Sequence, residues 1–87
     1  MESFDRAGWQ SFADLCKEYF SRCTFQDQLI SECQGLQDVA WVVFYQLPEQ
    51  SLAWLHREIP ALGGGVPVAL LSSGRADEVR QCLWRMP

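Results

Sequence analysis

Few residues of this chain have the types and spacing that catalysis requires. His56 is the single histidine, and histidine is the side chain that ordinarily changes its charge near neutral pH. A catalytic nucleophile needs a base within reach. His56 lies between Leu55 and Arg57 on an amphipathic stretch, and we interpret it as an exposed or capping residue. Glu49 and Glu58 are too scattered to form a catalytic carboxylate pair. We therefore expect no enzymatic activity and no cofactor.

The four cysteines lack the spacing of a metal site. Cys16, Cys23, Cys33 and Cys82 contain no C-x-x-C pair, which is the usual signature of structural zinc. Cys16 and Cys23 are two turns apart on one predicted helix face, too distant to form a disulfide. We expect no bound metal and interpret all four residues as buried free thiols of a protein in the reducing cytoplasm.

A run of three glycines, Gly63-Gly64-Gly65, has the backbone freedom of a phosphate-binding loop. However, no Lys-Ser/Thr pair follows it, and Pro67 removes a backbone N–H close to where an anion would bind. A tight corner of the chain is therefore the better interpretation.

We predict two short helices joined at this corner. The first begins at Pro48, whose missing N–H falls where a helix has no partner for it, and it ends before Pro60. Its apolar face consists of residues at spacings of three and four: Leu52, Leu55 and Ile59. The second helix begins at Pro67 and runs to Leu71.

The N-terminal part of the chain predicts two more helices. Residues 8–23 form the first, with Asp5 as a candidate N-cap. Its apolar stripe consists of Trp9, Phe12, Cys16, Tyr19, Phe20 and Cys23. The second begins at Thr24, with Asp27 in a capping-box arrangement, and Gly35 closes it.

A last helix is predicted over residues 76–86. Asp77 and Glu78 occupy its first turn and Arg85 its last, and both signs of charge match the helix dipole. Its buried stripe consists of Val79, Cys82, Leu83 and Met86. Trp84 falls off this stripe, which makes it a surface candidate, and Arg80 is placed to lie over its ring.

Residues 39–45 are ambiguous between strand and helix. Their β-branched and aromatic composition favours a buried strand. A single strand would have no partner elsewhere in the chain, and Asp38 is a plausible N-cap. We predict a central core helix, apolar nearly all round and with Trp41 buried, and the strand remains the alternative.

These elements indicate an all-α fold: a small single-domain bundle of about five to six short helices. At 87 residues the chain is long enough for one domain. We expect residues 1–36 to form an N-terminal helical extension packed on a core that residues 37–87 build.

The charge balance and the absence of targeting signals restrict the classes of partner. The net charge is −4, and nucleic-acid binding needs a basic surface that this chain lacks. A protein partner suits it better. The N-terminus has no secretory signal and no apolar run is long enough to span a membrane, so we expect a cytoplasmic protein.

The stretch from Gln37 to Met86 resembles the toxin-binding domain of Xre/MbcA/ParS-type antitoxins. The resemblance begins with V-A-x-x-V-F at residues 39–44 and A-W-L at residues 53–55. It continues with P-A-L-G-G at residues 60–64, then Pro67 with Leu70-Leu71, and ends with the spacing of Val79 and Leu83. The motif residues to which it assigns a structural role are Trp54, Leu55, Leu62, Gly63, Gly64, Pro67, Leu70 and Leu71.

Members of this family are small all-helical proteins that neutralise RES-domain toxins, which are enzymes that consume NAD. The resemblance implies that this chain is such an antitoxin and inhibits by binding. Members usually carry a helix-turn-helix domain before this region, whereas here 36 acidic and aromatic residues precede it. We therefore expect no direct DNA binding.

We expect the C-terminal segment to make the contact with the toxin. The family's chain usually runs beyond the last helix, and that tail can reach the toxin's active site. This sequence ends at Trp84-Arg85-Met86-Pro87, so these few residues must form any plug, or inhibition is steric. The expected contact residues are Arg75, Arg80, Trp84, Arg85 and Met86, and arginine and tryptophan often dominate interface energy.

Two other functions are compatible with the same fold. One is a small acidic inhibitor, phage-encoded, that blocks a nucleic-acid-handling defence complex by competing for a basic groove. The other is a homodimeric scaffold whose aromatic side chains are buried at a two-fold interface.

Overall fold

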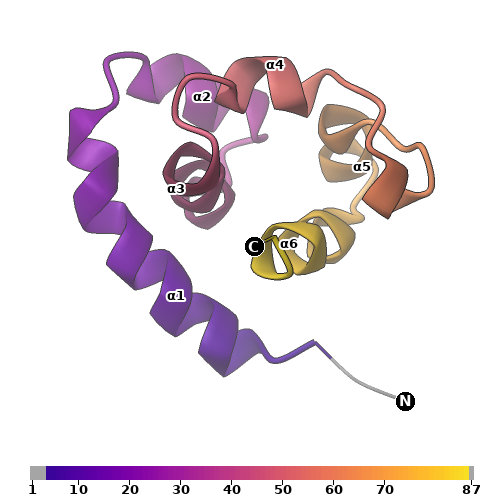
Figure 1. The fold of residues 1–87 in the computed structure, drawn as a ribbon, viewed down its shortest axis with the longest axis horizontal. Coiled ribbons are helices and arrows are strands. Elements are labelled where there is room, and N and C mark those ends of the chain that lie inside the picture. The colour runs from indigo at the N-terminus through magenta and orange to yellow at the C-terminus, as the bar shows by residue number, and fades with distance from the viewer. Residues whose placement is uncertain (1–3, 87) are drawn as a thin grey trace.

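The computed structural model describes residues 4–86 and consists of α-helices joined by short turns (Figure 1). The six α-helices are α1 (Arg6–Tyr19), α2 (Gln26–Glu32), α3 (Gln37–Gln46), α4 (Ser51–Leu55), α5 (Pro67–Ser72) and α6 (Ala76–Trp84). Two 3₁₀-helices, η1 (Phe20–Arg22) and η2 (Pro60–Leu62), lie between them. The all-α prediction is confirmed. The expected N-terminal extension, residues 1–36, and the expected core, residues 37–87, include residues 1–3 and 87, which lie outside the described residues.

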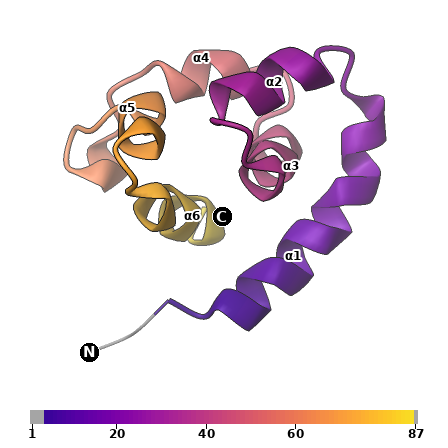
Figure 2. The ribbon, with the colours of Figure 1, turned by 180° about the vertical axis from the view of Figure 1, so that it is seen from behind.

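The helices are arranged as an arc around a centre. In Figures 1 and 2, α1, α2, α4 and α5 follow one another around the arc, and α3 and α6 lie within it. Helix α3 packs against α1, α2, α4 and α6, and α6 also packs against α5 and η2. The core therefore sits around α3, with α6 beside it.

Helix α1 starts where its cap predicts. The Asp5 carboxylate accepts a hydrogen bond of 3.0 Å from the backbone N–H of Gly8, as an N-cap does. The predicted apolar stripe places Trp9 and Cys16 in the core, and both are buried. The helix ends at Tyr19 instead of continuing to Cys23, because the chain tightens into η1 and turns towards α2.

The start of α2 differs from the prediction. Thr24 is exposed and makes no capping hydrogen bond, and Phe25 occupies the N-cap position. The ring of Phe25 packs edge-on against Phe44, with centroids 5.9 Å apart, so an apolar contact replaces the expected capping box. Gly35 closes the end as expected, with a φ of 78° and its N–H bonded to the carbonyl of Ile30.

Helix α3 settles the ambiguity at residues 39–45 in favour of helix. Its buried residues are Val39, Ala40, Val42, Val43 and Phe44. The expected burial of Trp41 is wrong, because Trp41 lies at the edge facing α1, where Lys17 covers its ring at 5.2 Å. Asp38 is not the N-cap. Leu36 holds that position and Asp38 lies in the first turn, where its carboxylate bonds to side chains of other helices.

Helix α4 is shorter than predicted at both ends. Pro48 lies in a turn, and the helix begins at Ser51. The carbonyl of Pro48 accepts a hydrogen bond from the buried Ser51 hydroxyl. It ends at Leu55, so Ile59 is not on its face. Ile59 is extended, because the ring of Pro60 disfavours helical angles there, and it pairs with Gly65 in an isolated antiparallel bridge.

The predicted glycine corner is confirmed. Gly63 and Gly64 have φ angles of 66° and 84°, a conformation that glycine adopts without steric cost. Pro67 then occupies the first turn of α5, as expected. The motif residues of the corner that are buried in the core are Trp54, Leu55, Pro67, Leu70 and Leu71.

Candidate protein-binding surface

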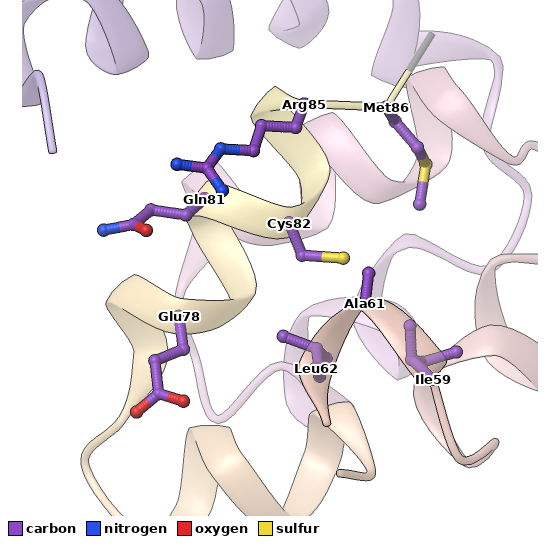
Figure 3. A pocket seen from close by; sticks show the side chains of 8 residues that line it. All are labelled: Ile59, Ala61, Leu62, Glu78, Gln81, Cys82, Arg85 and Met86. Carbon is purple, nitrogen blue, oxygen red and sulfur yellow. The ribbon is translucent and has the colours of Figure 1, made fainter. Parts of the chain in front are cut away.

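A groove of about 430 Å³ lies between α6 and η2 (Figure 3). One side is formed by the chain around η2 and the other by α6. Its apolar residues are Ile59, Ala61, Leu62, Cys82 and Met86, and its polar residues are Glu78, Gln81 and Arg85.

The periodicity of α6 explains which of its residues reach the groove. Glu78 and Cys82 are four residues apart, a spacing that places side chains on one helix face. Helix α6 ends at Trp84, two residues before the predicted end, so Met86 reaches the groove from just beyond the helix. In Figure 3 the Cys82 thiol and the Met86 side chain point towards the η2 side, whereas Gln81 and Arg85 extend outward along the edge of α6. The result is an apolar floor with a polar rim on one side.

The glycine corner positions the opposite wall. Pro60 starts η2, and the left-handed glycines after it return the chain to Gly65, whose carbonyl accepts a hydrogen bond from Ile59. Gly65 has little room for a side chain, since a Cβ there would lie 3.1 Å from the Leu62 carbonyl oxygen. This short closed loop presents Ala61 and Leu62 to α6.

The face of α6 away from the groove is bonded to α1 and α3. Arg80 donates hydrogen bonds of 2.8 and 3.3 Å to the Asp38 carboxylate and one of 2.9 Å to Asp77. The indole N–H of Trp9 donates to Asp38 at 2.8 Å, and Arg6 pairs with Asp77. The Arg80 and Asp38 side chains are only 15% and 19% exposed.

These contacts perturb the titration of Asp38. Burial by itself raises the pKa of a carboxyl group, but the hydrogen bonds from Arg80 and Trp9 and the charge of Arg80 act in the opposite direction. The net effect holds the pKa of Asp38 below its usual value. Asp38 is therefore a charged link between helices at neutral pH.

Trp84 is half on the surface and half against α1. Its side chain is 41% exposed, which fits the surface prediction. Its ring contacts Trp9 and Phe12, with centroid distances of 6.3 and 5.8 Å. The prediction that Arg80 stacks over this ring is wrong. The guanidinium is bonded instead to Asp38 of α3 and to Asp77, which lies one turn earlier in α6.

The five expected contact residues occupy three places. Arg85 and Met86 line the groove. Arg75, exposed at the start of α6, donates hydrogen bonds of 2.6 and 2.8 Å to Glu78. Arg80 and Trp84 lie on the side that α1 contacts.

Sequence reasoning missed the η2 wall of the groove and the part of Asp38. The α6 residues of the groove could have been found from their spacing of four. Ala61 and the alignment of η2 with α6 depend on tertiary packing and leave no local pattern. The link from Asp38 to Arg80 spans 42 positions, so no periodicity connects the two residues.

The cysteines and the histidine considered in the sequence analysis do not come together in one site. All four cysteines are unpaired. Burial raises the pKa of the Cys16 thiol to about 11, and burial, with smaller contributions from the Asp38 and Glu32 charges, raises that of Cys33 to about 12. His56 is exposed and pairs with Glu32. Within residues 4–86, no group of three His, Cys, Asp or Glu side chains is arranged to hold a metal ion.

None of the helices in the described part of the chain is long and apolar enough to cross a membrane. Separately, the lining of the groove offers apolar contact area and hydrogen-bonding groups to a macromolecular partner.

Comparison with known proteins adds one match. The sequence model of a protein family, described as antitoxin Xre/MbcA/ParS C-terminal toxin-binding domain, matches residues 42–86. The groove residues, from Ile59 to Met86, all fall within this match. No curated protein and no solved structure is similar enough to the chain to count as a match.

Proposed function

The chain belongs to the family of antitoxin Xre/MbcA/ParS C-terminal toxin-binding domains, and from this premise we propose that it neutralises a RES-type, NAD-consuming toxin by binding it directly. Family membership gives the protein an antitoxin-like, protein-binding role. The type of toxin, its NAD chemistry and the mode of inhibition are the further content of the proposal.

One observation carries the choice of surface. The α6–η2 groove lies wholly within the family match, and it combines an apolar floor with a polar rim. Methionine and arginine, which are enriched in protein interfaces, are both present at its C-terminal end as Met86 and Arg85. An apolar side chain of the toxin would fill the floor while polar groups pair along the rim.

The inhibition is stoichiometric and needs no catalytic residue or cofactor of this chain. Arg75, Arg85 and Met86 extend the contact along α6, whereas Arg80 and Trp84 contribute by holding the helix in place. The acidic net charge of −4 supports action without direct DNA binding. Four unpaired thiols support a reducing cytoplasmic location.

The test is complex formation with a RES-domain toxin encoded beside this chain. We expect a complex on size-exclusion chromatography and loss of NAD consumption at equimolar ratio. Free toxin and free chain eluting separately would contradict the proposal. The elution of the chain alone also tests the homodimeric alternative, which requires twice the mass of 10.0 kDa.

Filling the groove should weaken the complex specifically. Ala61 is exposed at the groove wall, so the fold should accommodate Ala61→Trp while the indole occupies the space for the toxin. We expect at least about a tenfold rise in Kd, which corresponds to one lost contact of ordinary strength. The matched control is Leu15→Trp, at an α1 position that is 74% exposed and lies outside the family match. Equal effects of the two substitutions would argue against the groove.

A further inference from the structure

We propose that contacts between α1, Asp38 and the far face of α6 form a clasp that positions α6 and thereby shapes the toxin-binding groove. The clasp consists of Arg6, Gly8, Trp9 and Asp38 on one side and Asp77, Arg80 and Trp84 of α6 on the other. This inference rests on the proposed function for its effect on binding, and its effect on the groove is measurable without a toxin.

The two faces of α6 have separate tasks. With 3.6 residues per turn, Arg80 and Trp84 each lie two positions from Cys82 and therefore point nearly half a turn away from it. Arg80 and Trp84 make the contacts with Asp38 and α1, and Cys82 and Arg85 line the groove. A shift of α6 on the clasp side therefore moves one wall of the groove.

The ion pairs of the clasp fix both the position and the rotation of α6. The planar guanidinium of Arg80 donates through Nε and Nη2 to Asp38 and through Nη1 to Asp77, a geometry that defines direction as well as distance. Trp9 donates to the same Asp38 carboxylate at 2.8 Å. The low exposure of Arg80 and Asp38 makes the loss of either partner costly for the other.

Gly8 sets how closely α1 approaches the end of α6. A Cβ at this position would lie 2.8 Å from Cη2 of Trp84 and 2.7 Å from a carboxylate oxygen of Asp5. The same Asp5 side chain caps α1 through the Gly8 N–H. The beginning of α1 is thus fitted against Trp84, at the end of α6 where Arg85 and Met86 enter the groove.

The clasp joins a part of the chain inside the family match to a part that precedes it. The groove lies within residues 42–86, which match the family, whereas Arg6, Gly8, Trp9 and Asp38 precede that match. Residues outside the recognised toxin-binding domain therefore act as positioning residues for a surface inside it.

The test uses the full chain with two clasp variants, Gly8→Ala and Asp38→Asn, and Ser11→Ala as an exposed control in α1. The first readout is the rate of iodoacetamide labelling of each cysteine in the free protein. Cys82 lies in the groove, whereas Cys16 and Cys33 are almost completely buried. In both clasp variants we expect the labelling rate of Cys82 to differ from that of the wild type by about tenfold in either direction. The reason is that a displaced α6 changes how far η2 covers the thiol.

In the same experiment Cys16 and Cys33 should remain protected, which separates a moved helix from general unfolding. The second readout is affinity for the RES-domain toxin, where we expect about a tenfold loss for both clasp variants and none for the control. Unchanged Cys82 labelling in Gly8→Ala would overturn the clasp. A gain in affinity would overturn it too, because α1 would then obstruct the toxin. If the wild type binds no toxin, the proposed function fails, and the labelling comparison still decides whether the clasp shapes the groove.

Discussion

The carboxylate of Asp38 joins three helices at one point. It belongs to α3 and accepts hydrogen bonds from Trp9 of α1 and Arg80 of α6. A partly buried carboxylate with charged and neutral donors contributes more than a solvent-exposed ion pair, because its partners lose their hydrogen bonds when it is removed. Asp38 is thus a structural charge.

Replacing Asp38 with Asn should destabilise the fold by about 2 kcal/mol at neutral pH, since hydrogen bonds to a charged group are lost. Hydrogen bonding lowers the pKa of Asp38 in the folded protein below its ordinary value of 3.8. The stabilisation by its charge is therefore fully present above the unfolded-state pKa and is lost as the pH falls through the folded-state pKa. The difference between wild type and Asp38→Asn should shrink below about pH 4. Urea unfolding at several pH values measures it.

The control for this experiment is Asp14→Asn, because Asp14 is exposed and accepts its hydrogen bond from the uncharged amide of Gln10. We expect a change within about 0.5 kcal/mol at every pH. A pH-independent difference between the wild type and Asp38→Asn would mean that its charge does not stabilise the fold.

At this scale the sequence reveals residue types better than residue partners. The apolar stripe correctly predicted that Trp9 is buried. Asp38 was visible only as an N-cap candidate, because an N-cap is a local pattern whereas the bond to Arg80 crosses 42 positions. For the same reason the predicted stack of Arg80 on Trp84, a spacing of one turn, was wrong.

Among the elements, the corner at residues 63–65 was the most predictable from sequence. Three glycines between two prolines leave the backbone few alternatives, and the positive φ angles at Gly63 and Gly64 follow. The boundaries of α4 were less predictable. Pro48 is compatible with a first helical turn and with an ordinary turn, and the difference depends on the hydrogen bond from the buried Ser51.

Substituting Gly64 tests how much the corner depends on its backbone. A Cβ at Gly64 would meet no atom within 4 Å, so Gly64→Ala changes only the cost of a φ of 84°. We expect a loss of about 1 to 2 kcal/mol in unfolding free energy, measured by urea denaturation. Glu58→Ala is the control, since Glu58 is an exposed loop residue and its φ angle is not positive. Equal stability of Gly64→Ala and wild type would show that the corner tolerates other backbone angles.

Helix α3 shows why composition and burial must be separated. Its residues have strand-like propensity, yet packing against α1, α2, α4 and α6 makes it a helix. Its apolar surface extends nearly all round, but Tyr45 is 47% exposed and Trp41 lies at the edge under Lys17. The surrounding helices cover most of its circumference and leave this strip at the surface.

For the molecule as a whole, the fold class and the family followed from sequence, but the shape of the binding surface did not. Residues 42–86, with their order of apolar, proline and glycine residues, match the sequence model of the family. The groove needs η2 beside α6, and α6 is held in turn by side chains from residues before the match. We propose that residues 1–36 serve mainly to complete this support.

The most direct test of the central claim is amide hydrogen exchange of the chain, free and saturated with a RES-domain toxin. We predict slower exchange on binding in η2 and in the second half of α6, the two elements that form the groove. Helix α2, which contributes no residue to the groove, should be unchanged. Protection confined to α1 and α2, with none in η2 or α6, would contradict the assignment of the α6–η2 groove as the toxin-binding surface.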